Sequence, residues 1–259
     1  MVPFESGRPR LVPAVARAAR LLELLEAAAR PMTISELARE LGVNKGTTRD
    51  LLETLRAHGL LARDEARKAY RLGPRLVRLG LSAQGQLDVA GVARPFLAEL
   101  SHQVNCAVLL VVPRVDRAEI VDKVDGGRVA VEVSATVGRR IRLAAGACGK
   151  VFLSFLDEPQ WKRYLAELTH PTPNTITDPT AYADELDRTR RLGYATDDEE
   201  YLMGVRATSA PVLDARGSLA AAVLVLGLTG TLPREELTRI GVLTAQSARA
   251  ISSALGAPD

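Results

Sequence analysis

Residues 33–59, TISELARELGVNKGTTRDLLETLRAHG, decide the fold of the N-terminal part of this chain. In their first half, apolar residues recur at the i, i+3, i+4, i+7 spacing of one helix face: Ile34, Leu37, Ala38 and Leu41. Thr33 and Glu36 have the spacing of a capping box, which predicts that the helix begins there. Gly42 is expected to end it, because glycine readily adopts the left-handed conformation that follows many helices.

A second helix is predicted over residues 44–58, with Asn44 as its N-cap. Its apolar face has the same spacing and consists of Thr48, Leu51, Leu52 and Leu55. The other face carries side chains suited to base edges and phosphates: Lys45, Thr47, Arg49 and Arg56. The two helices predict a helix-turn-helix whose recognition helix enters the major groove of double-stranded DNA with its first turns, which hold Lys45, Thr47, Thr48 and Arg49. Arg49 is the expected base reader, and a helical hairpin with a solvated charged face is the alternative for this pair alone.

The segment after the helix pair favours DNA binding over that alternative. Leu60 and Leu61 lead into residues 63–71, a polar and basic run that predicts two short strands around a charged turn. Such a wing would lay Arg67 and Lys68 along the phosphate backbone. Residues 1–80 carry 15 Lys and Arg against 9 Asp and Glu, whereas residues 81–259 carry 19 against 22. The basic charge therefore lies where a polyanionic partner is expected.

The run from Val12 to Gly80 resembles the winged helix-turn-helix of the IclR family of bacterial transcriptional regulators. Residues 142–153, RLAAGACGKVFL, and 197–212, DDEEYLMGVRATSAPV, resemble the effector-binding domain of the same family. The resemblance implies a ligand-responsive transcription factor with a GAF-like C-terminal domain, assembled as a homodimer or homotetramer.

Beyond the wing, the apolar pattern predicts an α+β domain with an antiparallel sheet flanked by helices. We expect a DNA-binding domain over 1–73, a linker helix over 74–89 and an effector-binding and oligomerisation domain over 90–259. Strands are predicted over 106–112, 117–124, 129–133, 194–197, 206–213 and 218–226, with residues 214–217 as a hairpin turn. Helices are predicted to start at Ala90, to cover 147–156, 158–168 and 180–192, and to close the chain from Pro233.

The resemblance also indicates where an effector would bind. It implies a pocket bounded by the turn of Gly146, Ala147 and Cys148, by Asp197, and by inward residues of the last strands. Strand alternation selects Val205 and Ala207 on one of these strands and Leu224 and Leu226 on its neighbour. Because the turn lies at a helix N-terminus, free amides and the helix dipole favour an anion there. We therefore expect a small organic acid whose carboxylate meets the amides of Ala147 and Cys148, while Asp197 accepts a hydroxyl or amine.

Other functions are less well supported by the sequence. Its three histidines are scattered, and no nucleophile elbow or zinc-protease motif occurs, so an enzyme and a cofactor are not expected. Gly149-Lys150 lacks the earlier glycine and the following Ser or Thr of a phosphate-binding loop. The acidic residues 197–200 could bind a metal with Cys148, or form a solvated loop in which one carboxylate pairs with Arg206. A C-terminal domain that serves only oligomerisation also stays open.

Composition indicates the compartment. The chain of 259 residues is 47% hydrophobic and 25% charged, which is ordinary for two globular domains. No apolar run reaches the roughly 18 residues of a membrane span, and the N-terminus has no signal-peptide core. Two cysteines without ligand spacing fit a reduced, cytoplasmic protein.

Overall fold

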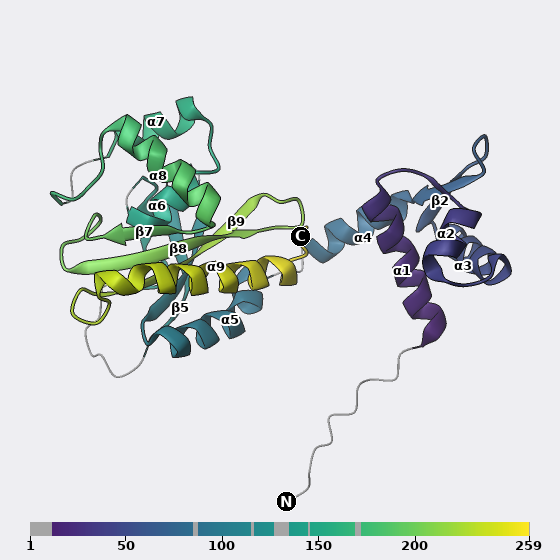
Figure 1. Cartoon of the computed structure of the whole chain (residues 1–259), viewed down its shortest axis with the longest axis horizontal. Helices are drawn as coiled ribbons and strands as arrows, with labels where there is room; N and C mark the ends of the chain where they lie inside the picture. Colours follow the sequence, from purple (N-terminus) through teal and green to yellow (C-terminus); the bar gives the residue numbers. More distant parts are fainter. Residues whose placement is uncertain are drawn as a thin grey trace, which may run out of the picture. The chain divides into compact units, whose positions relative to one another are not determined.

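The computed structural model describes residues 12–84, 88–114, 117–126, 135–144, 146–168 and 172–258. The chain forms two compact units, Met1–Leu87 and Asp88–Asp259. Each unit has its own hydrophobic core and is described by itself (Figure 1).

The first unit is a winged helix-turn-helix. Its elements are α1 (Pro13–Ala28), β1 (Met32–Thr33), α2 (Ile34–Leu41), α3 (Lys45–Ala57), β2 (Leu61–Asp64), β3 (Ala69–Leu72) and α4 (Pro74–Gln84). The three strands form a small antiparallel sheet in the order β1-β3-β2. Its core joins the inward faces of α1, α2 and α3 to the sheet, through Leu21, Leu25, Leu37, Leu52, Leu55 and Tyr70.

The predicted helix boundaries in this unit are set by capping contacts. The Thr33 hydroxyl accepts the Glu36 amide at 3.4 Å, and the Glu36 carboxylate accepts the Thr33 amide at 2.7 Å, so the capping box is confirmed. Gly42 ends α2 with a φ of 66°. The Asn44 side chain accepts the Thr47 amide at 2.8 Å and starts α3. These contacts fix where the turn between α2 and α3 begins and ends.

The second unit is built on a six-stranded antiparallel sheet. The strands are β4 (Ala107–Pro113), β5 (Arg117–Val124), β6 (Arg140–Arg142), β7 (Ala195–Asp198), β8 (Val205–Leu213) and β9 (Leu219–Leu228), in the spatial order β6-β5-β4-β9-β8-β7. The helices are α5 (Val89–Val104), α6 (Gly146–Leu153), α7 (Glu158–Ala166), α8 (Pro179–Leu192) and α9 (Leu237–Ala254), and the short 3-10 helix η1 (Arg234–Glu236) precedes α9. The expected α+β class is confirmed.

Helices cover both faces of this sheet (Figure 1). α5 and α9 pack on one face, and α6 packs on the other with α7 and α8 beyond it. The central strand β9 alternates between the two layers: Val223 and Val225 face α5 and α9, whereas Leu224 and Leu226 face α6. Since β9 is buried on both faces, its sequence is almost continuously apolar.

Several boundaries differ from those predicted. β1 and β6 are too short to leave a periodic pattern and were not predicted. α6 ends at Leu153, three residues before the expected end, and Pro233 opens η1 so that α9 starts only at Leu237. The strand predicted over 129–133 lies outside the described residues, as do residues 85–87 of the predicted linker helix. α4 belongs to the first compact unit, and α5 begins at Val89.

Candidate functional site

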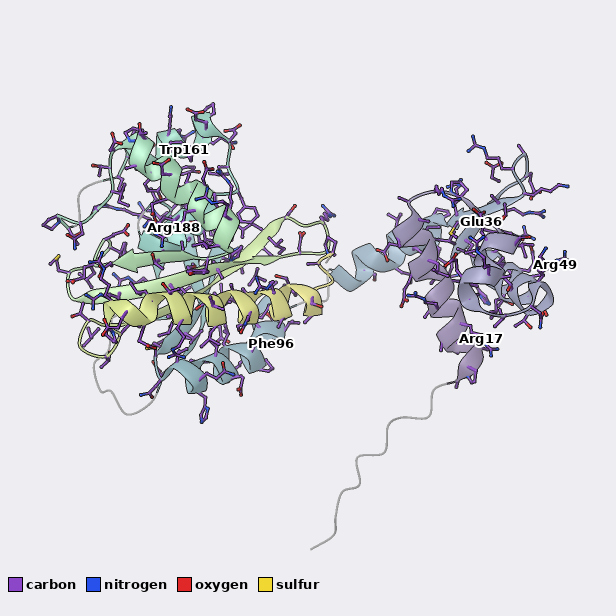
Figure 2. The ribbon with its side chains drawn as sticks, in the orientation of Figure 1. Arg17, Glu36, Arg49, Phe96, Trp161 and Arg188 are labelled. Atoms are coloured by element: carbon purple, nitrogen blue, oxygen red, sulfur yellow. The ribbon has the colours of Figure 1, made fainter. Side chains whose placement is uncertain are left out.

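The recognition helix α3 presents part of the expected DNA-binding set to solvent. Lys45, Arg49 and Arg56 are exposed, and Thr47 is half-buried. Figure 2 shows Arg49 at the outer edge of the first unit, on α3. The exposed cations therefore share a helix surface that is free to meet DNA.

Thr48 is a correction to the expected set. Its side chain is 0% exposed, and its hydroxyl donates to the Asn44 carbonyl oxygen at 3.1 Å. The apolar periodicity of the helix includes Thr48, so packing against the core turns it away from the groove. Thr48 is a core residue, and its side chain has no exposed surface to offer a base.

Arg56 is held by the recognition helix itself. Its guanidinium pairs with the Glu53 carboxylate at 2.7 Å, and the Tyr70 hydroxyl donates to the same carboxylate at 2.8 Å. The hydrogen bonds from Arg56 and Tyr70 hold the pKa of Glu53 below its usual value. Burial and the Glu53 hydrogen bond raise the pKa of Tyr70. Arg56 is therefore already partly neutralised, which makes it a weaker phosphate ligand than an unpaired arginine would be.

The wing places its basic pair at the tip of the β2–β3 turn. Arg67 and Lys68 are both exposed. The Asp64 carboxylate accepts the Arg67 amide at 3.1 Å, and Lys68 closes the turn with a φ of 51°. The turn thus holds two cations away from the core and exposed to solvent.

The second unit contains a cavity of about 310 Å³ between α6 and the sheet. All eight residues expected at the effector site line it: Gly146, Ala147, Cys148, Asp197, Val205, Ala207, Leu224 and Leu226. Its volume lies at the lower end of the roughly 300–1,000 Å³ typical of ligand pockets. The lining is mainly apolar, with Asp197 buried at one end.

The remaining wall comes from residues that the sequence reasoning missed. They are Leu109, Ile120, Ala135, Arg139, Ile141, Tyr201 and Leu202. Arg139 is the basic side chain among the described lining residues. It follows Gly138 and precedes β6, where no periodic pattern indicates which way a side chain points. Leu109 and Ile120 do lie on predicted strands, but nothing local links those strands to α6.

Gly146 and Asp197 approach closely at the N-terminus of α6. Gly146 has a φ of 64°, and a Cβ atom there would lie 2.4 Å from the Asp197 Oδ2 atom. The Asp197 Oδ1 atom accepts the amides of Glu200 at 2.7 Å and Tyr201 at 3.4 Å. Burial raises the pKa of Asp197 in spite of these hydrogen bonds. A buried carboxyl group therefore lies beside the N-terminal end of α6 and lines the cavity.

Cys148 faces the same cavity as a buried thiol. Burial raises its pKa to about 12, so the thiol is protonated near neutral pH. Cys106 and Cys148 are both free cysteines. The cavity thus contains a neutral, weakly polar side chain at this position.

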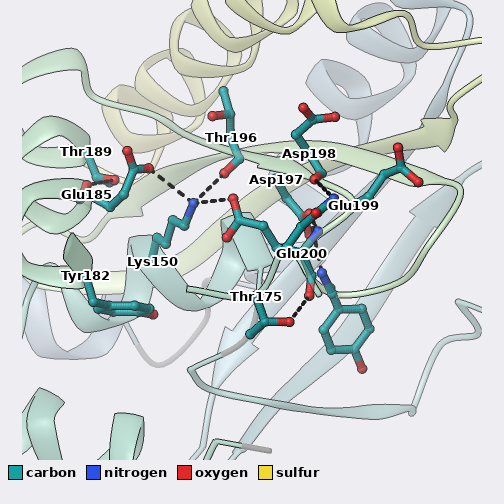
Figure 3. Close-up of polar contacts among 12 residues, drawn as sticks. Lys150, Thr175, Tyr182, Glu185, Thr189, Thr196, Asp197, Asp198, Glu199 and Glu200 are labelled. Atoms are coloured by element: carbon teal, nitrogen blue, oxygen red, sulfur yellow. Dashed lines mark hydrogen bonds and ion pairs between the residues drawn. The ribbon is translucent and has the colours of Figure 1, made fainter. Parts of the chain in front are cut away.

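The acidic residues 197–200, at the end of β7 and just after it, do not form a solvated loop. Asp198 does pair with Arg206 at 2.5 Å, as expected. Asp197, however, is 3% exposed, and Glu200 pairs with the buried Lys150 at 2.6 Å (Figure 3). The described residues contain no group of three or more His, Cys, Asp and Glu side chains that could hold a metal ion. Within the same residues, no helix is long and apolar enough to cross a membrane.

These two units define a class of protein: a winged helix-turn-helix joined to an α+β domain with an internal cavity, the architecture of a one-component regulator. Comparison with known proteins gives the family. Residues 14–65 match the IclR helix-turn-helix domain, and residues 82–253 match the bacterial transcriptional regulator IclR C-terminal domain. The chain belongs to the IclR family of bacterial transcriptional regulators.

Individual relatives are similar to this chain over almost its whole length. The HTH-type transcriptional regulator XynR of Escherichia coli (strain K12) is 31% identical over 250 residues, which cover 96% of this chain and 99% of XynR. The crystal structure of Pseudomonas aeruginosa HmgR has 30% identity and a TM-score of 0.81, covering 95% of this chain and 99% of HmgR. The crystal structure of the Agobacterium tumefaciens repressor BlcR has 25% identity and a TM-score of 0.82, and the match covers 96% of this chain and 99% of BlcR. The chain is a DNA-binding transcriptional regulator with a C-terminal effector-binding domain, and it is not an enzyme.

Proposed function

We propose that this regulator senses a small organic acid with an aromatic or aliphatic body in the cavity between α6 and the sheet. The observation that carries the proposal is the make-up of the cavity lining. Leu224, Leu226 and Ile120 supply apolar wall, Arg139 supplies a positive charge, and Asp197 supplies a buried acceptor. An apolar pocket with few polar groups binds a ligand whose polar groups match them in number and charge.

The polar groups assign an orientation to such a ligand. Its carboxylate meets the amides of Ala147 and Cys148 at the start of α6, where the helix dipole favours an anion, with Arg139 as a further cation in the lining. A hydroxyl or amine on the same ligand donates to Asp197, since a second carboxylate close to Asp197 would be repelled. The body of the ligand lies against the leucines of β9.

Calorimetry with paired compounds tests the charge requirement. Benzoate and hexanoate are titrated into the protein beside benzamide and hexanamide, which keep the shape and lose the charge. We expect the acids to bind at least about tenfold more tightly than the amides, the equivalent of about 1.4 kcal/mol. Arg139→Gln should reduce that preference, whereas Arg140→Gln, which changes a neighbouring arginine outside the lining, should leave it intact. Amides that bind as tightly as the acids would overturn the acid proposal.

Leu224→Asp tests whether strand β9 forms part of the ligand site. A carboxylate at this position should abolish binding of the acids, because it replaces apolar wall by a charge of the same sign. Unchanged binding would remove β9 from the site. If no compound of a broad panel shifts the melting temperature of the parent protein, the domain serves oligomerisation instead.

We further propose that the regulator acts in the cytoplasm as a homodimer or homotetramer that binds two operator half-sites. Val12 and Val15 at the start of the first unit are 61% and 66% exposed, and Val77 and Leu79 on α4 are 65% and 47% exposed. Apolar side chains of this kind support an interface with a second copy. Light scattering coupled to gel filtration measures the oligomeric state, and a monomer that still binds its operator would contradict this part of the proposal.

A further inference from the structure

Lys150 is a buried lysine that does not line the cavity. Its side chain is 1% exposed and lies on α6, one turn beyond the cavity residues Gly146, Ala147 and Cys148. Its ammonium group donates to three oxygens: Glu200 Oε1 at 2.6 Å, the Thr196 carbonyl at 3.0 Å and Glu185 Oε2 at 3.1 Å (Figure 3). All three ammonium hydrogens therefore have acceptors.

These contacts tie together two adjoining segments that both line the cavity. The first turn of α6 is one wall, and the segment 197–202, here called the acidic turn, supplies Asp197, Tyr201 and Leu202 to another. Lys150 on α6 reaches the acidic turn through Glu200 and the end of β7 through Thr196. Glu185, its third partner, lies on α8 and lines no part of the cavity.

Glu200 is held in the acidic turn by its backbone as well as by its side chain. Its amide donates to Asp197 Oδ1 at 2.7 Å. Its carbonyl accepts the hydroxyl of Thr175 at 2.7 Å (Figure 3). The hydroxyl of Thr172 donates to the same carbonyl at 3.1 Å. Glu200 therefore links the Lys150 ammonium group, through its side chain, to the backbone that contacts Asp197 and Thr175.

A buried ion pair of this kind is weak evidence for stability. Removing two charges from water carries a large desolvation cost, and the attraction between them offsets it only with good geometry and further hydrogen bonds. A well-packed apolar pair is often equally stable. What the ionic contact adds is direction, because the ammonium hydrogens fix where Glu200 and Thr196 lie relative to α6.

We propose that Lys150 is a positioning residue that acts through Glu200 to hold the acidic turn at a set spacing from α6. It thereby determines access to the cavity and the fit of a ligand that it never touches. The mechanical part of this inference stands on the contacts alone, and only its effect on ligand affinity rests on the proposed function.

Alkylation of Cys148 measures the spacing without any ligand. Cys148 is 3% exposed and lines the cavity, so its reaction with N-ethylmaleimide reports opening between α6 and the acidic turn. Cys106→Ala removes the other cysteine and serves as the parent chain. In this background, Glu200→Gln should accelerate alkylation about tenfold. Glu185→Gln, which removes the other carboxylate on the same ammonium group, should leave the rate within about twofold.

A purely structural ion pair predicts a different pattern. Loss of either carboxylate would then change the alkylation rate in proportion to the loss of overall stability, which thermal unfolding of each variant measures. Equal acceleration by the two variants, or acceleration by neither, would overturn the positioning role. Lys150→Arg keeps the charge and should stay closer to the parent rate than Lys150→Met does. The Gln variants still decide the question if Lys150→Met fails to fold.

Benzoate titration tests the effect of Lys150 on ligand affinity. If benzoate binds to the parent chain, Glu200→Gln should lower the affinity for benzoate about tenfold, whereas Glu185→Gln should leave that affinity unchanged. Equal affinities in both variants would overturn the effect on ligand fit. If neither benzoate nor hexanoate binds the parent chain, the proposed ligand class loses its support, while the alkylation rates still test the positioning role of Lys150.

Discussion

Tyr70, on strand β3 of the wing, donates a hydrogen bond of 2.8 Å to Glu53 on the recognition helix α3. The Tyr70 ring is 1% exposed, and the Arg63 guanidinium lies over it at 5.8 Å from its centre. One residue thus belongs to the core of the first unit and also links the wing to the helix expected in the major groove. The orientation of the wing relative to α3 depends on this link.

Removing the Tyr70 hydroxyl tests that dependence. Tyr70→Phe should lower the free energy of unfolding of the first unit by about 1 kcal/mol, which is the usual net contribution of such a hydrogen bond to stability. Operator affinity should fall as well, because the wing is less well oriented. Urea unfolding and mobility-shift titration measure the two effects. Glu65→Gln, in an exposed residue of the wing turn, is the control and should leave stability unchanged. An unaltered midpoint in Tyr70→Phe would show that the hydrogen bond does not link the two elements.

Arg49 is expected to contact a base from the first turns of α3. Arg49→Ala should reduce affinity for the cognate operator by about 1–3 kcal/mol and relax specificity at one base pair. Thr48→Val, which changes a buried neighbour, should leave base preference intact. The measurement is a mobility-shift titration with the operator and its single-base variants. Unchanged operator affinity in Arg49→Ala would contradict the assignment of α3 as the recognition helix.

Arg67 is expected to contact phosphate rather than bases. Arg67→Ala should weaken binding to all sequences by a similar factor and reduce the slope of log affinity against log salt concentration by about 1. Titrations on specific and non-specific duplexes at several salt concentrations measure this slope. A loss confined to the cognate operator would instead indicate that the wing reads bases.

Gly146 should tolerate alanine less well than another glycine of positive φ. Gly146→Ala and Gly204→Ala both place a side chain in the left-handed region, which costs about 1 kcal/mol. At Gly204 the added Cβ meets open space, whereas at Gly146 it lies 2.4 Å from the Asp197 carboxylate. We expect Gly146→Ala to be the more destabilising by at least about 1 kcal/mol, because its neighbours must shift. Fluorescence of Trp161, the one tryptophan of the chain, follows unfolding of the second unit. Equal losses in the two variants would show that Asp197 moves aside freely.

Glu200 should make the second unit less stable as pH rises. Its pKa is raised to about 7, mainly by burial. The positive charge of Lys150 lowers this pKa, and the negative charges of Asp197 and Glu185 raise it further. The folded-state pKa exceeds the ordinary glutamate value of 4.5, so the stabilisation is fully present below about pH 4.5 and is lost as pH rises through about 7. The melting temperature of the parent relative to Glu200→Gln should therefore fall between pH 5 and pH 8. A difference that stays constant, or that grows with pH, would contradict this direction.

Sequence alone was sufficient where structure follows from neighbours along the chain. The capping box of Thr33 and Glu36, the Asn44 cap and the glycine at position 42 act within one turn, so the limits of α2 and α3 could be predicted. Strand alternation acts over two residues, and it selected the faces of β8 and β9 that line the cavity. These rules need no knowledge of what packs against the element.

The same rules left one residue ambiguous. Thr48 satisfies the apolar spacing of α3 and also lies in the turns expected to meet DNA. Periodicity alone does not decide between the core and the groove for a small residue at the border of the two faces. Packing against the rest of the first unit buries Thr48 completely, and this decides its role.

The other features depended on segments that are distant in sequence. Lys150 meets Glu185 and Glu200, which lie 35 and 50 positions away, and no local pattern predicts that a lysine will be buried between them. Arg139 joins the cavity because β6 pairs at the edge of the sheet, a contact too short to leave a periodic signal. Local sequence determines which elements form and which faces they bury, since backbone hydrogen bonds and side-chain periodicity act over a few residues. Only the tertiary structure decides which of those faces meet, because the charges and cavity walls that come together are supplied by elements far apart along the chain.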